Sequence, residues 1–195
     1  MKTNNKLKVI IRRARPLYES MLIKPEGFIM PSDAVFNAKI RALEKRWDTW
    51  GSKIVAELKK TTGLTFMEQD IRCYVTAGLP ASFSHPLTLR IYPTMDRTFD
   101  VLVHELIHRL FDNPKHPKRY QNARKKFLEE YSNESSVTRN HIILMAVHAH
   151  ILLKFFGQKR LKIASSGKHP DYARGWQIVN ELGYQNILKQ VFDTH

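Results

Sequence analysis

The apolar residues of this chain follow helical spacing through three long segments. Between Val35 and Leu58, and again from 137 to 156, they recur three, four and seven positions apart, as on a helix with one buried face. From 98 to 112 they leave almost no polar face, which is typical of a helix in a protein interior. The segments predict three helices, of which the first ends near Gly63.

Shorter runs between these helices have the alternating or β-branched character of strands. Residues 71–76 and 87–92 predict two strands, and residues 6–12 predict a weaker one at the N-terminus. Helices and strands in this order predict an α+β fold. In this fold the helix over 98–112 is buried against a small β-sheet.

The C-terminal part of the chain predicts further helices. Residues 117–131 form a basic amphipathic segment, and residues 157–170 predict a basic loop with glycine and serine. Two short helices are predicted over 171–182 and 185–192.

We find no internal repeat and no shift in composition that would mark a domain boundary. The prediction is a single domain over 1–195, with a strand and loop over 1–31 and a helical tail over 158–195. Gly51 is expected to weaken the first long helix midway.

The buried helix carries the sequence His104-Glu105-Leu106-Ile107-His108. Two histidines four residues apart share one helix face about 6 Å apart, where a single metal ion can bind both. Glu105 can then deprotonate a water at the open side of the metal. Five residues can also match by chance, but burying these groups without partners would cost several kcal/mol, which metal coordination offsets. A metal site is the favoured interpretation.

Two histidines hold zinc poorly, because catalytic zinc usually takes three protein ligands and a water. His141 is the preferred third ligand, since it lies on the core-facing stripe of the helix over 137–156 and needs a partner there. Glu134 would supply a carboxylate just upstream, and His116 lies in a basic loop eight residues after His108. The sequence leaves these two alternatives open.

Two more histidines follow on the same predicted helix. His148 lies about 10 Å beyond His141 along the stripe, so both cannot bind one ion directly. It is expected to support the site, to face substrate or to lie in the core. His150 points away from the stripe and is expected to have no role at the site.

The segment Val103-His104-Glu105-Leu106-Ile107-His108 and the order of elements resemble the zincin metallopeptidases, and in layout the minimal gluzincin-type folds. The resemblance implies a zincin-like fold in which a later helix brings the third ligand. It implies His104 and His108 as zinc ligands, Glu105 as general base and proton shuttle, and a peptide or protein as substrate. By position only, it implies that the strand over 87–92 holds the peptide in extended form.

The chain departs from the patterns of the named zincin clans after the motif. Glu130 and Glu134 have the spacing of the gluzincin Glu-x-x-x-Asp motif, but the second residue is Glu. Pro114 stands six residues after His108, where a metzincin has its third histidine. The resemblance therefore implies a zinc peptidase without fixing the third ligand. Tyr74, Tyr92, His148 and Tyr172 are candidates to stabilise the oxyanion of the reaction.

The chain is strongly basic, with 32 lysines and arginines against 18 acidic residues and a net charge of +14. The basic residues cluster over 12–15, 115–126 and 159–168. Such a surface attracts polyanions. No zinc ribbon, helix-turn-helix spacing or single-strand motif is present, so contact with nucleic acid is expected to be non-specific.

The charge supports a rival interpretation of the motif: a binding protein or basic nucleic-acid-associated protein on a zincin scaffold, with little or no peptidase activity. Glu105 argues against this, because a structural zinc site has no need of that carboxylate. Spartan-type proteases also join this motif to basic surfaces, but their separate DNA-binding ribbon is missing here.

Cysteine content and hydropathy indicate the compartment. The single cysteine, Cys73, cannot form an internal disulfide and is expected to be a buried, inert thiol. No apolar run approaches the ~18 residues that span a bilayer, and the run over 6–13 is too short for a secretory signal. We expect no membrane partner and a cytoplasmic protein.

Overall fold

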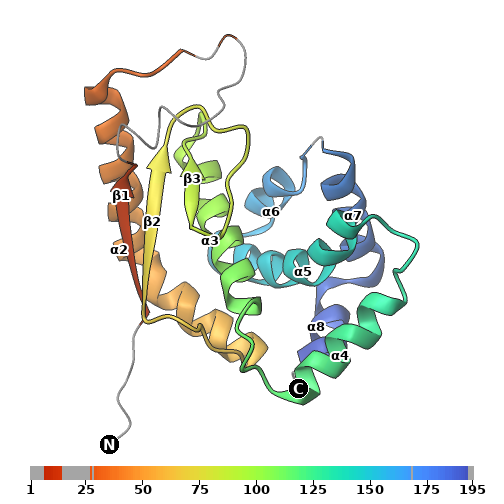
Figure 1. The fold of residues 1–195 in the computed structure, drawn as a ribbon. Helices are drawn as coiled ribbons and strands as arrows, with labels where there is room; N and C mark the ends of the chain where they lie inside the picture. The colour runs from red at the N-terminus through yellow and green to blue at the C-terminus, as the bar shows by residue number, and fades with distance from the viewer. Residues whose placement is uncertain (1–6, 15–26, 28, 168, 193–195) are drawn as a thin grey trace, which may run out of the picture. The chain divides into compact units, whose positions relative to one another are not determined.

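A computed structural model describes residues 7–14, 27, 29–167 and 169–192 of the chain. The described residues form three strands and seven helices, which confirms the predicted α+β class (Figure 1). Most of the predicted N-terminal loop lies outside the described residues, as do Arg15 and Lys168 of the basic clusters.

The chain divides into two compact units. The first comprises Met1–Val55 and Phe66–Arg109, and the second comprises Ala56–Thr65 and Leu110–His195. The sequence-based division into a single domain stays a prediction.

The first unit is built on a parallel sheet with the strand order β1-β2-β3. Its elements are β1 (Lys8–Arg13), β2 (Asp70–Thr76), β3 (Thr88–Arg90), the first part of α2 (Asp33–Thr62) and most of α3 (Met95–Phe111). β1 buries Val9 and Ile11, and β2 buries every second residue from Ile71 to Val75, so each strand turns one apolar face to the core. The three strand predictions are confirmed, although the last is shorter than expected.

Helix α2 runs without interruption through Gly51. A Cβ at this position would lie 2.4 Å from the Trp47 ring, so only glycine lets the indole lie against the helix there. The Trp47 ring in turn lies 6.4 Å from that of Phe99 on α3. Glycine costs a helix about 1 kcal/mol relative to alanine, and the packing of Trp47 offsets this cost.

Helix α3, which carries the histidine motif, is held at both ends within the first unit. Its first turn is capped by Thr94, whose Oγ1 accepts a hydrogen bond of 3.2 Å from the Arg97 amide. Towards its last turn, Arg109 donates to the Ser84 carbonyl oxygen over 2.7 Å and forms an ion pair with Glu68. These contacts hold both ends of the helix that carries the motif against the rest of the first unit.

The second unit is a bundle around α5. Its helices are α4 (Lys118–Glu129), α5 (Ser136–Phe156), α6 (Gln158–Ala164), α7 (Pro170–Leu182) and α8 (Tyr184–Phe192). Helix α7 comes close to α5 at Gly175, where a Cβ would lie 2.9 Å from the Met145 sulfur. No helix among the described residues combines the length and the apolar character that a membrane crossing needs.

The predicted loop over 157–170 is wrong, because α6 occupies half of it. Gly157 has a φ of 81° and ends α5, and the chain re-enters helix at the next residue. Arg160 and Ala164 of α6 are buried by the bundle. Of the basic residues in this short helix, Lys159 and Lys162 are exposed, whereas Arg160 is buried.

A buried carboxylate, Glu57, joins α2 to α5 in the second unit. It lies 2.8 Å from His150 Nε2 and 2.6 Å from Lys154 Nζ. Burial by itself would raise the pKa of Glu57, but the hydrogen bonds from His150 and Lys154 outweigh it and hold the pKa at about 2. His150, for which the sequence predicts no role at the site, therefore has a structural role: it binds Glu57.

Glu57→Gln is expected to lower the free energy of unfolding at pH 7 by roughly 2–3 kcal/mol, since each pKa unit is worth 1.4 kcal/mol. The stabilisation is present above the ordinary pKa of 4.5 and is lost as the pH falls towards 2. Urea unfolding at pH 7, 5 and 3.5 measures it. Glu129→Gln, which breaks an exposed pair with Lys125, is the control and should change little. If the free energy of unfolding changed with pH in the same way in Glu57→Gln and in the wild type, this assignment would be contradicted.

Candidate metal centre

His104 and His108 lie one turn apart on α3, as the spacing predicts. Their ring centroids are 5.1 Å apart and the rings meet edge to face at 71°. Both side chains are half-buried on a helix whose other faces are almost wholly buried. The pair therefore faces a partly open space, which a metal site with room for a further ligand needs.

His141 lies in the first turns of α5 and is buried. Its Nδ1 lies 2.7 Å from the carbonyl oxygen of Val137. Because that oxygen can only accept, Nδ1 carries the proton and Nε2 keeps its lone pair. Metal-binding histidines usually donate their second ring nitrogen to a carbonyl or carboxylate in this way.

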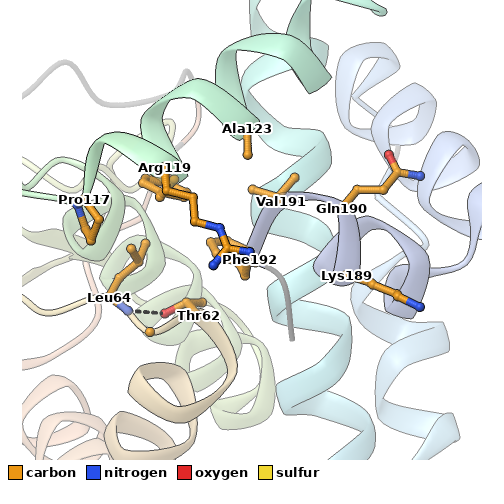
Figure 2. A pocket seen from close by; sticks show the side chains of 11 residues that line it. Thr62, Leu64, Pro117, Arg119, Ala123, Lys189, Gln190, Val191 and Phe192 are labelled. Carbon is orange, nitrogen blue, oxygen red and sulfur yellow. Dashed lines mark hydrogen bonds between the residues drawn. The ribbon is translucent and has the colours of Figure 1, made fainter. Parts of the chain in front are cut away.

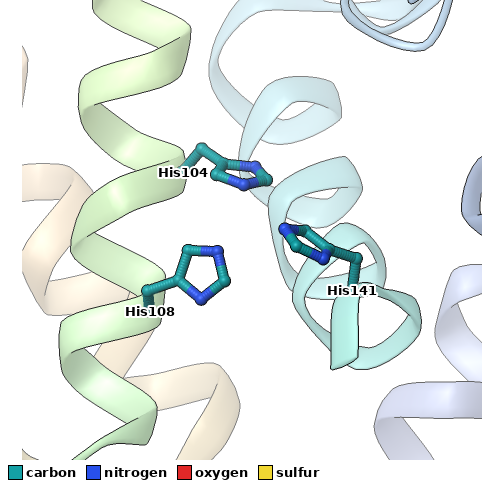
Figure 3. Close-up of side chains that lie close together, drawn as sticks. All are labelled: His104, His108 and His141. Atoms are coloured by element: carbon teal, nitrogen blue, oxygen red, sulfur yellow. The ribbon is translucent and has the colours of Figure 1, made fainter. Parts of the chain in front are cut away.

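The three histidines come together. One nitrogen each of His104, His108 and His141 lies within 4.8 Å of the others, and this group could hold a metal ion (Figure 3). Burial lowers the pKa of His141, despite its hydrogen bond to Val137, and so favours the neutral ring. Metal binding requires neutral imidazole, so burial favours the form of this ring that a metal ligand needs.

The two alternative third ligands are engaged elsewhere. Glu134 accepts hydrogen bonds of 2.9 and 2.7 Å from Nε and Nη2 of Arg174. His116 is buried, with Nε2 2.6 Å from the carbonyl oxygen of Leu110. Among the described residues, the metal-competent group that includes the motif histidines is completed by His141. Its role as a ligand stays a prediction.

Glu105 is buried beside the histidine pair, with 7% of its surface exposed. Burial raises its pKa to about 7. A carboxylate with this pKa can exchange a proton with water near neutral pH, which is the requirement for a general base.

Cys73 on β2 is fully buried, as expected. Burial raises the pKa of its thiol, and the nearby Glu105 carboxylate raises it further. The thiol stays protonated and has no nucleophilic character at neutral pH.

The residues predicted to stabilise the oxyanion have different surroundings in the structure. The Tyr172 ring packs edge to face on His141 with a centroid distance of 4.7 Å. The Cζ atoms of Arg90 and Arg97 lie 5.2 and 5.6 Å from the centroid of the Tyr92 ring. His148 is buried, and its ring centroid lies 6.4 Å from that of Trp176. Tyr172 thus contacts a histidine of the group directly.

A polar cluster that the sequence does not predict joins the start of α5, the helix that carries His141, to the start of α7. Ser135 caps α5 by accepting a hydrogen bond of 3.0 Å from the Thr138 amide, and the Ser135 hydroxyl also donates to Asp171 at the start of α7. Thr138 Oγ1 donates to the same aspartate over 3.2 Å. A serine before an apolar helical run predicts an N-cap. The contact of Ser135 with Asp171, which is 36 residues away, cannot be predicted from the local sequence.

Comparison of the chain with the models of known protein families, with curated proteins and with solved structures gave no match.

Proposed function

We propose that this protein is a zinc-dependent peptidase of zincin type, with His104, His108 and His141 as metal ligands and Glu105 as general base. One observation carries the proposal: three imidazoles within 4.8 Å of one another, two of them on a helix where a buried glutamate lies between them in sequence. Three protein ligands with one position left open is the arrangement of catalytic zinc, whereas structural zinc sites are closed by four.

The roles of the residues follow from their chemistry. When bound, zinc supplies Lewis-acid polarisation of the substrate carbonyl and of the attacking water. Glu105 accepts a proton from that water and holds it in a buried environment that favours the protonated acid. The water oxygen bonds to the carbonyl carbon and the C–N bond of the peptide breaks. The proton passes from Glu105 to the leaving amine nitrogen, which restores the carboxylate. Val137 and Tyr172 keep the His141 ring oriented.

β3 lies at one edge of the three-stranded sheet, as in the extended-peptide arrangement that the zincin resemblance implies. On the outer side of this strand, Thr88 exchanges both of its backbone hydrogen bonds with Phe83, and the Arg90 amide donates to Ser82 Oγ. An extended substrate could therefore add to β3 only where residues 82 and 83 move away. The proposed substrate, a peptide or an unfolded segment of a protein, follows from the zincin resemblance and not from an open strand edge.

Removal and return of the metal test the proposal. Zinc-loaded protein is expected to cleave members of a quenched fluorescent peptide library, to lose this activity in 1,10-phenanthroline and to regain it when stoichiometric zinc replaces the chelator. Unchanged cleavage after the metal is gone, verified by elemental analysis, would overturn the proposal. Zinc bound without any cleavage of the library would favour the rival, a binding protein on the same scaffold.

A further inference from the structure

One cluster of basic residues in the second unit lies on helix α4 and just before it. Between Asn113 and Leu128 the chain has six lysines and arginines and no acidic residue. Helix α4 spans most of this segment and buries Tyr120 and Phe127, which turns its other faces to solvent. The segment lies outside the chemistry proposed for the histidine group.

Four cations form two adjacent pairs on the exposed side of α4. Lys118 and Arg119 lie in its first turn, and Lys125 and Lys126 follow seven residues later; all four are exposed. Seven residues are close to two full turns, so the pairs lie on one side of the helix about 10 Å apart. This is the axial rise of about three nucleotides on one strand of a duplex.

A groove beside α4 adds a further cation. It is lined by the end of α2, by α4 and by α8, and has a volume of about 280 Å³ (Figure 2). Arg119 of α4 and Lys189 of α8 both line it, over a floor that includes Phe192 and Leu64. Figure 2 shows the Arg119 side chain extending from α4 towards Phe192 on α8.

We propose that this face, formed by Lys118, Arg119, Lys125 and Lys126 on α4 together with Lys189 on α8, binds the phosphate backbone of nucleic acid. Amide side chains, like those of lysine and arginine, contact phosphate oxygens in protein–DNA complexes, and the exposed Gln121 and Asn122 lie between the two cation pairs.

The composition of the face favours nucleic acid over a membrane. The large apolar side chains exposed among the described residues are Ile29, Met30, Val35, Met67, Val137 and Ile163. None of them lies on α4 or α8. The face thus offers charge without an apolar group that would insert among lipids.

The test is binding of a fluorescein-labelled 20-nucleotide DNA, single-stranded and duplex, to the full chain over a range of salt concentrations. Five phosphate contacts predict a slope of log K against log salt of about −4 to −5 for duplex. Replacing Lys118, Arg119, Lys125 and Lys126 with alanine should reduce that slope by about 3 to 4. The affinity at 100 mM salt should fall at least 100-fold.

A matched control removes the same charge elsewhere. Arg41→Ala, Lys45→Ala, Lys159→Ala and Lys162→Ala take four exposed cations from α2 and α6. This variant should stay within about threefold of the wild type. Alanine is the best helix former, so both variants should keep the helical circular dichroism of the wild type. Equal losses in both variants would overturn the proposal, and so would equally strong competition by polyglutamate or by anionic vesicles at matched charge.

Discussion

Glu105→Gln is expected to keep the metal and to lose peptidase activity by several orders of magnitude. Glutamine has nearly the shape of glutamate, so the buried side chain still fits. Its amide cannot accept the proton of the attacking water, and the step assigned to Glu105 has no other group to perform it. The measurement is kcat/KM on the best library peptide, with zinc content determined on the same sample.

Glu129→Gln is the matched control for this change, because Glu129 is an exposed carboxylate on α4. It should leave both cleavage and zinc content unchanged. Cleavage by Glu105→Gln at the wild-type rate would rule out the role assigned to this carboxylate. Loss of zinc together with activity would mean that Glu105 supports the metal rather than the proton transfer.

His104→Ala and His108→Ala are each expected to abolish stable zinc binding. Each change leaves two imidazoles, and two protein ligands hold zinc poorly. His141→Ala removes the third member of the group and should weaken zinc affinity by more than the 10–100-fold typical of a residue that only orients a ligand. Competition against a chromogenic chelator measures all three variants.

His85→Ala is the control for these variants, because this exposed histidine lies on the loop before β3 and does not belong to the metal-competent group. It should bind zinc as the wild type does. Full zinc occupancy in a protein that lacks both His104 and His108 would contradict the site.

The sequence predicts the parts of the site that depend on helical periodicity. Four-residue spacing placed His104 and His108 on one face of α3, and the apolar stripe of α5 placed His141 towards the core. Both statements need only the local geometry of a helix. They are also the statements that the structure bears out most closely.

Other features depend on contacts between distant residues and leave no local pattern. Glu57 and His150 are separated by 93 positions, and neither residue signals the other in the sequence. The glycine at 51 suggested a weak helix, whereas its role is to accommodate Trp47. The same limit applies to α6, whose basic composition is typical of a loop. Its helix is stabilised by the burial of Arg160 and Ala164 in the bundle, which the local sequence does not predict.

The most direct test of the metal centre is the zinc K-edge X-ray absorption spectrum of the zinc-loaded protein. The site predicts three imidazole nitrogens and one further light atom, all at about 2.0–2.1 Å, in a four-coordinate shell. A spectrum with two imidazoles and a carboxylate would instead point to Glu134 and contradict the assignment of His141.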